Sequence, residues 1–171
     1  MAPTELNDKY IQLQLILHEL ESVVIGYSGG VDSTLLLKVA VDTLGNNALA
    51  VIGKSETYPT REYEEAEKLA KSFGAKYEIV YTEETDDLKF KENPPDRCYY
   101  CKTELFTKLT EIAKGKNINW ICDGTNVDDL GDFRPGMKAV KEKNVRSPLL
   151  EAGFSKNDIR ELSKALELPT W

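Results

Sequence analysis

The strongest constraint on the fold is a regular alternation of short apolar runs with stretches of helical periodicity. Helices are predicted over 5–21, 61–73, 99–114 and 155–167, with another that contains Leu35 and Ala40 and stops near Gly45. Strands are predicted over 23–25, 48–52, 76–81 and 118–122, with 145–149 as a candidate for a last short strand. This order is typical of a parallel sheet with helices on both faces. We therefore expect an α/β fold, a three-layer α/β/α doubly wound sheet of the Rossmann-like kind.

Length, charge and cysteine count exclude several classes of protein for this chain. The 171 residues suffice for one domain over residues 1–171, and the formal charge of -7 disfavours extended contact with nucleic acid. No stretch approaches the roughly 20 consecutive apolar residues of a membrane span, and the N-terminus lacks a secretory pattern. Three cysteines are too few for a disulfide framework. We expect a cytoplasmic protein with no membrane partner, and the sequence leaves a homo-oligomer open.

The loop after the first predicted strand carries the clearest chemistry. It reads Ser28-Gly29-Gly30-Val31-Asp32-Ser33 and opens a helix, where unpaired backbone N–H groups favour phosphate. Gly29 and Gly30 allow close approach to phosphate oxygens, Ser28 and Ser33 add hydroxyl donors, and the Asp32 carboxylate can hold Mg²⁺. A simple helix cap by one polar residue is the alternative, and it leaves the rest of the hexapeptide unexplained. We predict an ATP site in which Asp32 and Ser33 are catalytic.

Two other phosphate loops fail on spacing. Gly53-Lys54-Ser55 resembles the end of a Walker A loop, but Ala48 stands where that pattern needs glycine. A Rossmann fingerprint needs a different glycine spacing from that of residues 26–30. Without a Walker lysine, cleavage between the α and β phosphates is favoured over kinase chemistry.

Further candidates lie on neighbouring loops and helix starts. Asp128, in an acidic loop after the predicted strand 118–122, is a candidate second metal ligand, with a solvated loop acid as the alternative. Lys54 and Thr125 are candidate adenosine contacts. Arg97 and Arg134 could neutralise phosphates or an acyl-adenylate, or could be surface charges.

The cysteines allow a weaker metal hypothesis. Cys98 and Cys101 have the spacing of a metal or dithiol pair, and with Cys122 and His18 they would complete four zinc ligands. Cys122 ends a strand predicted to be buried, however, and positions three apart on a helix can simply pack together. We favour packing, or a minor redox role for the pair.

The motif of residues 28–33 resembles the signature of the PP-loop ATP pyrophosphatases. A second match lies in Ser147-Pro148-Leu149-Leu150, followed by the stretch 155–162 and by Leu168-Pro169. Members of that superfamily adenylate a substrate and release pyrophosphate. The resemblance therefore implies an ATP- and Mg²⁺-dependent enzyme that activates a small carboxylate.

Three stretches narrow the resemblance: residues 93–102, 123–126 and 131–136. They are similar to the N-terminal domain of the sulfur transferases that mature the nickel-pincer cofactor of lactate racemase. That family implies adenylation and then thiolation of a nicotinate-derived mononucleotide, with sulfur supplied from just beyond the position of Leu168-Pro169-Thr170-Trp171. We therefore expect these residues to form the adenylating half, with the sulfur-transfer segment and C-terminal domain outside them.

Two rival functions remain open. One is another PP-loop activity, such as amidation in NAD or GMP synthetase, or tRNA thiolation. The other is a non-catalytic ATP-binding module that resembles the universal stress proteins.

Overall fold

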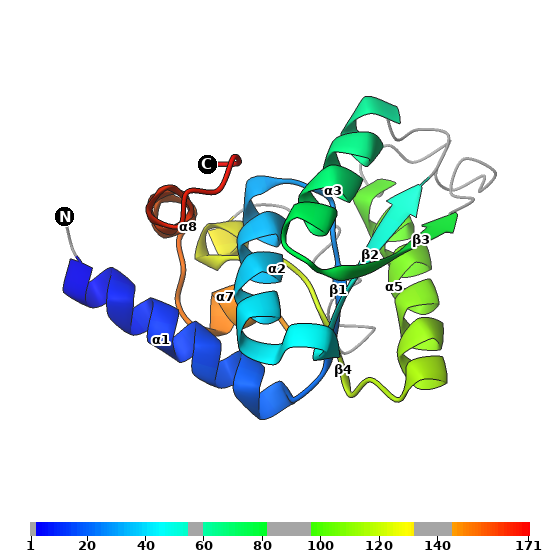
Figure 1. Cartoon of the computed structure of the whole chain (residues 1–171), viewed down its shortest axis with the longest axis horizontal. Helices are drawn as coiled ribbons and strands as arrows, with labels where there is room; N and C mark the ends of the chain where they lie inside the picture. Colours follow the sequence, from blue (N-terminus) through cyan, green and yellow to red (C-terminus); the bar gives the residue numbers. More distant parts are fainter. Residues whose placement is uncertain (1–2, 55–59, 82–96, 132–144) are drawn as a thin grey trace.

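A four-stranded parallel sheet organises the chain (Figure 1). The computed structural model describes residues 3–54, 60–81, 97–131 and 145–171. The strands stand in the order β3-β2-β1-β4, and all neighbouring pairs are parallel. They comprise β1 (Val23–Gly26), β2 (Ala48–Lys54), β3 (Lys76–Tyr81) and β4 (Trp120–Cys122). Because β1 lies between β2 and β4, the strand order reverses at β1, and ligands of doubly wound sheets bind beside such a point.

Helices cover both faces of the sheet (Figure 1). Helices α2 and α3 pack on one face, and α5 packs on the other against β1 and β4. Helices α1 and α8 contact α2, and α7 contacts α1. The bounds are α1 (Pro3–Leu20), α2 (Val31–Leu44), α3 (Thr60–Ser72), α5 (Arg97–Lys116), α7 (Pro148–Glu151) and α8 (Lys156–Ala165), with short 3₁₀ turns η1 (Gly45–Asn47) and η4 (Val127–Gly131). This arrangement confirms the predicted three-layer fold.

Strand alternation divides the core in two. Val23 and Ile25 of β1 join the cluster under α2, whereas Val24 joins Phe106 and Leu109 of α5. Successive strand residues point to opposite faces, so a strand buried on both sides is apolar throughout, as β1 is. In the part of the chain that the structure describes, no helix has the length and apolar character needed to cross a membrane.

Two predicted strands differ from the structure. The strand expected over 118–122 begins only at Trp120, because the Asn119 N–H donates to the Ser22 hydroxyl at 2.9 Å. The prediction over 145–149 is wrong beyond Arg146, which forms a single parallel bridge with Cys122. Helix α7 starts directly afterwards at Pro148. Proline suits the first helical position, since its φ is already helical and no N–H is needed there.

Candidate functional site

The loop between β1 and α2 is shaped by Gly29. Its φ of +83° lies in the left-handed region, and a methyl group built there would stand 3.0 Å from the Cβ of Ala66 on α3. Only glycine meets both conditions without strain. Gly30 follows as the N-cap of α2 in an extended conformation, and no side chain caps the helix. The N-terminus of α2 is thus exposed to a ligand at the carboxyl edge of the sheet.

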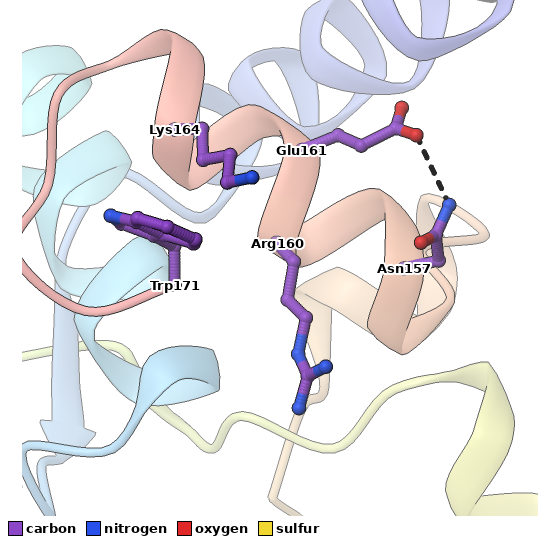
Figure 2. Close-up of a pocket in the computed structure, with 5 residues that line it drawn as sticks. All are labelled: Asn157, Arg160, Glu161, Lys164 and Trp171. Atoms are coloured by element: carbon purple, nitrogen blue, oxygen red, sulfur yellow. Dashed lines mark hydrogen bonds between the residues drawn. The ribbon is translucent and has the colours of Figure 1, made fainter.

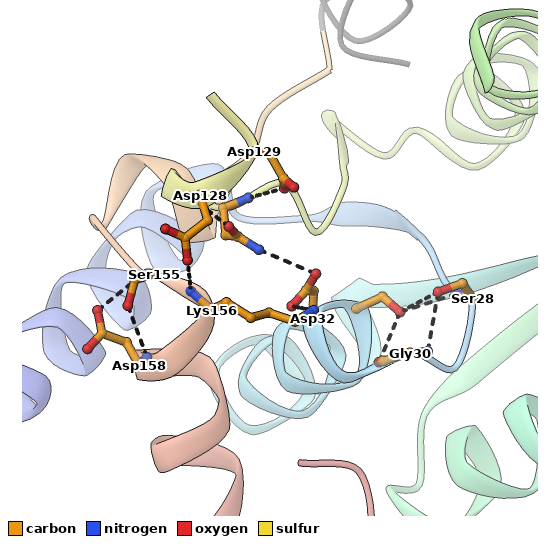
Figure 3. Close-up of polar contacts among 10 residues, drawn as sticks. Ser28, Gly30, Asp32, Asp128, Asp129, Ser155, Lys156 and Asp158 are labelled. Carbon is orange, nitrogen blue, oxygen red and sulfur yellow. Dashed lines mark hydrogen bonds and ion pairs between the residues drawn. The ribbon is translucent and has the colours of Figure 1, made fainter. Parts of the chain in front are cut away.

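Two hydroxyl groups face each other inside this loop. The oxygens of Ser28 and Ser33 are 3.1 Å apart, and the Ser28 N–H donates to the Ser33 oxygen at 3.3 Å. The Gly30 N–H donates to the Ser28 hydroxyl at 3.3 Å (Figure 3). The hydroxyls therefore hold the loop in shape and stand at the mouth of α2, where an anion would also meet its backbone N–H groups.

Asp32, in the first turn of α2, is contacted by donors from two distant segments (Figure 3). The ammonium of Lys156, the first residue of α8, lies 2.8 Å from Asp32 Oδ1. The amide of Asn126, from the loop after β4, lies 3.4 Å from Asp32 Oδ2. The Asn126 side chain is oriented by the Asp128 N–H, which donates to its Oδ1 at 2.8 Å. Three segments therefore meet at one carboxylate beside the strand-order reversal.

The backbone of α8 is fixed at the same point. Asp128 Oδ2 accepts the Lys156 N–H at 2.7 Å. Ser155 and Asp158 form a reciprocal capping box, and Lys9 of α1 binds Asp158 at 2.7 Å. Since caps and ion pairs hold the first turn of α8, the Lys156 side chain extends toward Asp32 from a backbone that is held in place.

The loop after β4 rests on a buried carboxylate. Asp123 is 5% exposed and accepts three hydrogen bonds: from the Thr125 N–H at 3.2 Å, the Thr125 hydroxyl at 2.8 Å and the Ser147 hydroxyl at 2.7 Å. Gly124 packs on the start of α2, where an added methyl would stand 3.2 Å from the Ser33 nitrogen and from Asp32 Cβ. The absence of a side chain at Gly124 lets this loop carry Asn126 up to Asp32.

The remaining predicted residues are spread more widely. Thr125 is buried, and its hydroxyl serves Asp123. Lys54 ends β2, and its ammonium lies 4.8 Å from the ring centre of Tyr63 and 5.8 Å from that of Tyr81. Arg97 starts α5, but its side chain lies outside the described residues, as does all of Arg134. The structure therefore gathers Ser28, Gly29, Gly30, Asp32, Ser33 and Asp128 and leaves Lys54 on the β2/β3 side.

The cysteine hypothesis gains no support from the described part of the chain. Cys122 is fully buried, and burial raises the pKa of its thiol. His18 is exposed on α1. The side chains of Cys98 and Cys101 lie outside the described residues. Among the residues that are described, no group of three or more His, Cys, Asp or Glu side chains could hold a metal ion.

A separate hollow of about 340 Å³ lies on the outer face of α8 (Figure 2). Its lining includes the Lys164 ammonium, which lies 4.1 Å from the ring centre of Trp171. The other lining residues are Asn157, Arg160 and Glu161. All five lining residues are exposed, and none belongs to the loop of residues 28–33. The hollow is a surface feature of α8 rather than part of the polar cluster around Asp32.

Lys156 and Asn126 are the site residues whose roles were not predicted. They lie 124 and 94 residues from Asp32 in the chain. Both stood inside stretches that carried the resemblance, 155–162 and 123–126, but no local pattern linked either to Asp32. Their position at the carboxyl edge of a parallel sheet was the available signal.

Known proteins match this chain in sequence and in fold. It is 43% identical to an uncharacterised protein of Synechocystis, over 97% of the chain and 62% of that protein. It is 38% identical to the pyridinium-3,5-bisthiocarboxylic acid mononucleotide synthase of Lactiplantibacillus plantarum, over 97% of the chain and 60% of that enzyme. The chain thus spans less than two thirds of the length of either relative.

The fold is shared with solved structures of lower sequence identity. The NH3-dependent NAD synthetase of Campylobacter jejuni superposes with a TM-score of 0.73 at 18% identity, over 97% of this chain and 73% of that one. The family model described as NAD synthase matches residues 5–104, which include the loop of residues 28–33. The resemblance read from that loop is therefore confirmed, and the chain belongs to the NAD synthase family.

Proposed function

We propose that these residues form the ATP-binding, adenylating part of an enzyme that activates the carboxylate of a nicotinate-derived mononucleotide for sulfur insertion. The observation that carries the proposal is the convergence of Asp32, Lys156 and Asn126 beside the Ser28–Ser33 loop at the strand-order reversal. The choice of substrate is supported by the 38% identity to the Lactiplantibacillus plantarum synthase. In the enzymes of that family the sulfur-transfer step belongs to other segments, and we assign only the activation step to these 171 residues.

The chemistry needs position and charge more than proton transfer. An ionised substrate carboxylate attacks the α-phosphorus of ATP, the bond to the bridging oxygen of the β-phosphate breaks, and pyrophosphate leaves with the electron pair. The products are an acyl-adenylate and pyrophosphate, so no general base is required. The Ser28 and Ser33 hydroxyls and the N-terminus of α2 would hold the phosphates, and the Lys156 ammonium would offset charge on the leaving group.

Asp32 fits Mg²⁺ as one carboxylate ligand. Mg²⁺ in nucleotide sites takes one or two protein carboxylates and completes its shell with phosphate oxygens and water, so the described residues need not supply a full cage. Asp128 is the proposed second ligand, and its described contact is with the backbone of α8. When bound, the ion would neutralise charge on the departing pyrophosphate.

The proposal gives secondary roles in substrate binding to the other predicted site residues. Lys54 and Thr125 are assigned to adenosine, and Arg97 and Arg134 to the phosphates or the acyl-adenylate. Because the Lys54 ammonium already lies against two tyrosine rings, we expect its substitution to weaken ATP binding less than changes at Asp32 or Ser33.

Calorimetric titration of ATP with Mg²⁺ into the wild-type chain and its variants tests this assignment. Ser33→Ala and Asp32→Ala are each expected to weaken ATP binding by about tenfold or more. Ser33→Ala removes a hydroxyl donor to the phosphates, and Asp32→Ala removes the carboxylate that would hold Mg²⁺ against them. Ser72→Ala, on the last residue of α3, is the matched control and should bind like wild type. Unchanged ATP affinity in both loop variants would refute the site.

Membership of the NAD synthase family favours a second candidate, amide formation from the same acyl-adenylate. The two reactions differ in the nucleophile that attacks the activated carbonyl: ammonia in amidation and sulfide in sulfur insertion. Supplying both nucleophiles to the full-length protein and identifying the product by mass spectrometry distinguishes them. A carboxamide product favours amidation, and a thiocarboxylate favours sulfur insertion.

A further inference from the structure

Both oxygens of the Asp32 carboxylate already have donors. Oδ1 is 2.8 Å from the Lys156 ammonium, and Oδ2 is 3.4 Å from the Asn126 amide. The Asp32 side chain is 25% exposed, so water screens this pair only partly. In this arrangement the Lys156 ammonium neutralises the Asp32 carboxylate, so the proposed metal ligand is already paired with a positive charge.

A divalent cation and the ammonium compete for the same oxygen. A cation bound at Oδ1 would take the lone pair that Lys156 uses, and it would stand next to a second positive charge. Binding of the metal at Oδ1 of the nucleotide-free protein must therefore displace the ammonium, and binding at Oδ2 must displace the Asn126 amide beside the same positive charge. Displacement leaves the Lys156 charge without this partner, which opposes metal binding.

The ammonium can leave while its helix stays in place. The Lys156 N–H is held by the 2.7 Å bond to Asp128, and the first turn of α8 is held by the Ser155–Asp158 capping box. The side chain is 39% exposed and has four rotatable bonds. A polyphosphate bound at the Ser28–Ser33 loop would give the ammonium a new anionic partner while the Lys156 backbone stays in place.

We propose that the Lys156–Asp32 ion pair couples metal binding to nucleotide binding. Without nucleotide, the ammonium holds the Asp32 carboxylate and keeps divalent cations out. The phosphates of ATP draw the ammonium away, and Asp32 becomes a metal ligand only when there is a nucleotide for the metal to act on. Lys156 binds Asp32 without nucleotide and the phosphates with it, and the scheme rests on the proposed function for the identity of the anion.

The test measures Mn²⁺ binding by electron paramagnetic resonance, first with protein alone. Removing the charge in Lys156→Gln should tighten Mn²⁺ binding in the absence of nucleotide by about tenfold, within the range usual for coupled sites. Lys164→Gln is the control, since it makes the same charge change on the same helix, where the ammonium lies over Trp171. The double variant Lys156→Gln with Asp32→Asn should lose the gain, which places the ion at Asp32.

A second arm compares ATP in EDTA with MnATP as titrants. In wild type, Mn²⁺ should tighten ATP binding by a factor about tenfold larger than in Lys156→Gln, because the variant has no ion pair to displace. Coupling acts equally in both directions, so the same factor describes the effect of ATP on Mn²⁺ affinity. Lys156→Arg keeps the charge and should keep the coupling. Unchanged Mn²⁺ affinity in Lys156→Gln, or an equal gain in Lys164→Gln, would overturn the proposal. Failure of every protein to bind ATP would instead refute the nucleotide site, and the Mn²⁺-only arm would still decide whether the ion pair excludes cations.

Discussion

Replacing Gly29 with alanine should damage the fold of the loop itself. Its φ of +83° is unfavourable for any L side chain, at a cost of about 1–2 kcal/mol. The new methyl would also stand 3.0 Å from Ala66 Cβ and 3.3 Å from Ala66 Cα, and overpacking of this kind costs about 1–3 kcal/mol. We expect a loss of about 3 kcal/mol in the free energy of unfolding. For a chain of this size that loss corresponds to a fall of roughly 6–12 °C in Tm.

Gly30→Ala is the matched change at the next position. Its backbone is extended, with φ −75°, and the nearest atom to an added methyl is the Ser28 hydroxyl at an ordinary 3.4 Å. We expect the free energy of unfolding to change by no more than about 0.5 kcal/mol. The methyl would instead stand in the loop where phosphate must approach, so ATP affinity should fall while stability is kept.

Urea unfolding and ATP titration of both variants check this division of roles. The expected pattern is a destabilised Gly29→Ala and a stable Gly30→Ala with weakened ATP binding. Equal stability of the two variants would refute the argument from φ and from the Ala66 contact. Wild-type ATP affinity in Gly30→Ala would refute close approach of phosphate to the loop.

Three further predictions concern the surrounding structure. Asp123→Ala should lower the free energy of unfolding by about 3 kcal/mol or more, because the buried Thr125 and Ser147 hydroxyls lose their acceptor. Asp123→Asn keeps an acceptor oxygen and should cost less, and urea unfolding measures both. Burial opposes ionisation of Asp158, but hydrogen bonds from Lys9 and Ser155 outweigh it and lower the pKa of the carboxyl below 3.8. That stabilisation is full above pH 3.8 and is lost as pH falls through the folded-state pKa, so Lys9→Met should destabilise more at pH 7 than at pH 2 in urea titrations. Cys122, fully buried with a raised thiol pKa, should resist iodoacetamide until the protein unfolds, as peptide mapping would show.

The loop of residues 28–33 could be predicted because its signals are local. An apolar run, adjacent glycines and a following helical period occupy one continuous stretch, and the structure joins β1 to α2 there. The apolar runs also predicted the parallel sheet, whose order follows from alternating strands and helices. By contrast, Pro148 stood in an apolar run that also suits a strand, and its preference for a helix start decided the structure.

The partners of Asp32 could not be predicted, because folding alone brings them together. Lys156 and Asn126 carry side chains that are common on solvated surfaces, and nothing near them in the chain points to a carboxylate more than 90 residues away. Thr125 shows the opposite difficulty. A hydroxyl at the carboxyl end of a strand is typical of a ligand contact, but no local pattern predicted that this one also donates to the buried carboxylate of Asp123.

Product analysis with ATP labelled at the α-phosphate tests the central claim most directly. The protein would be incubated with labelled ATP, Mg²⁺ and a nicotinate-derived mononucleotide, and the labelled products separated. Adenylation predicts labelled acyl-adenylate or AMP with one pyrophosphate for each, only when the carboxylate is present, and loss of both in Asp32→Ala. Labelled ADP with inorganic phosphate, or ATP that binds but stays intact with the carboxylate, would contradict the claim.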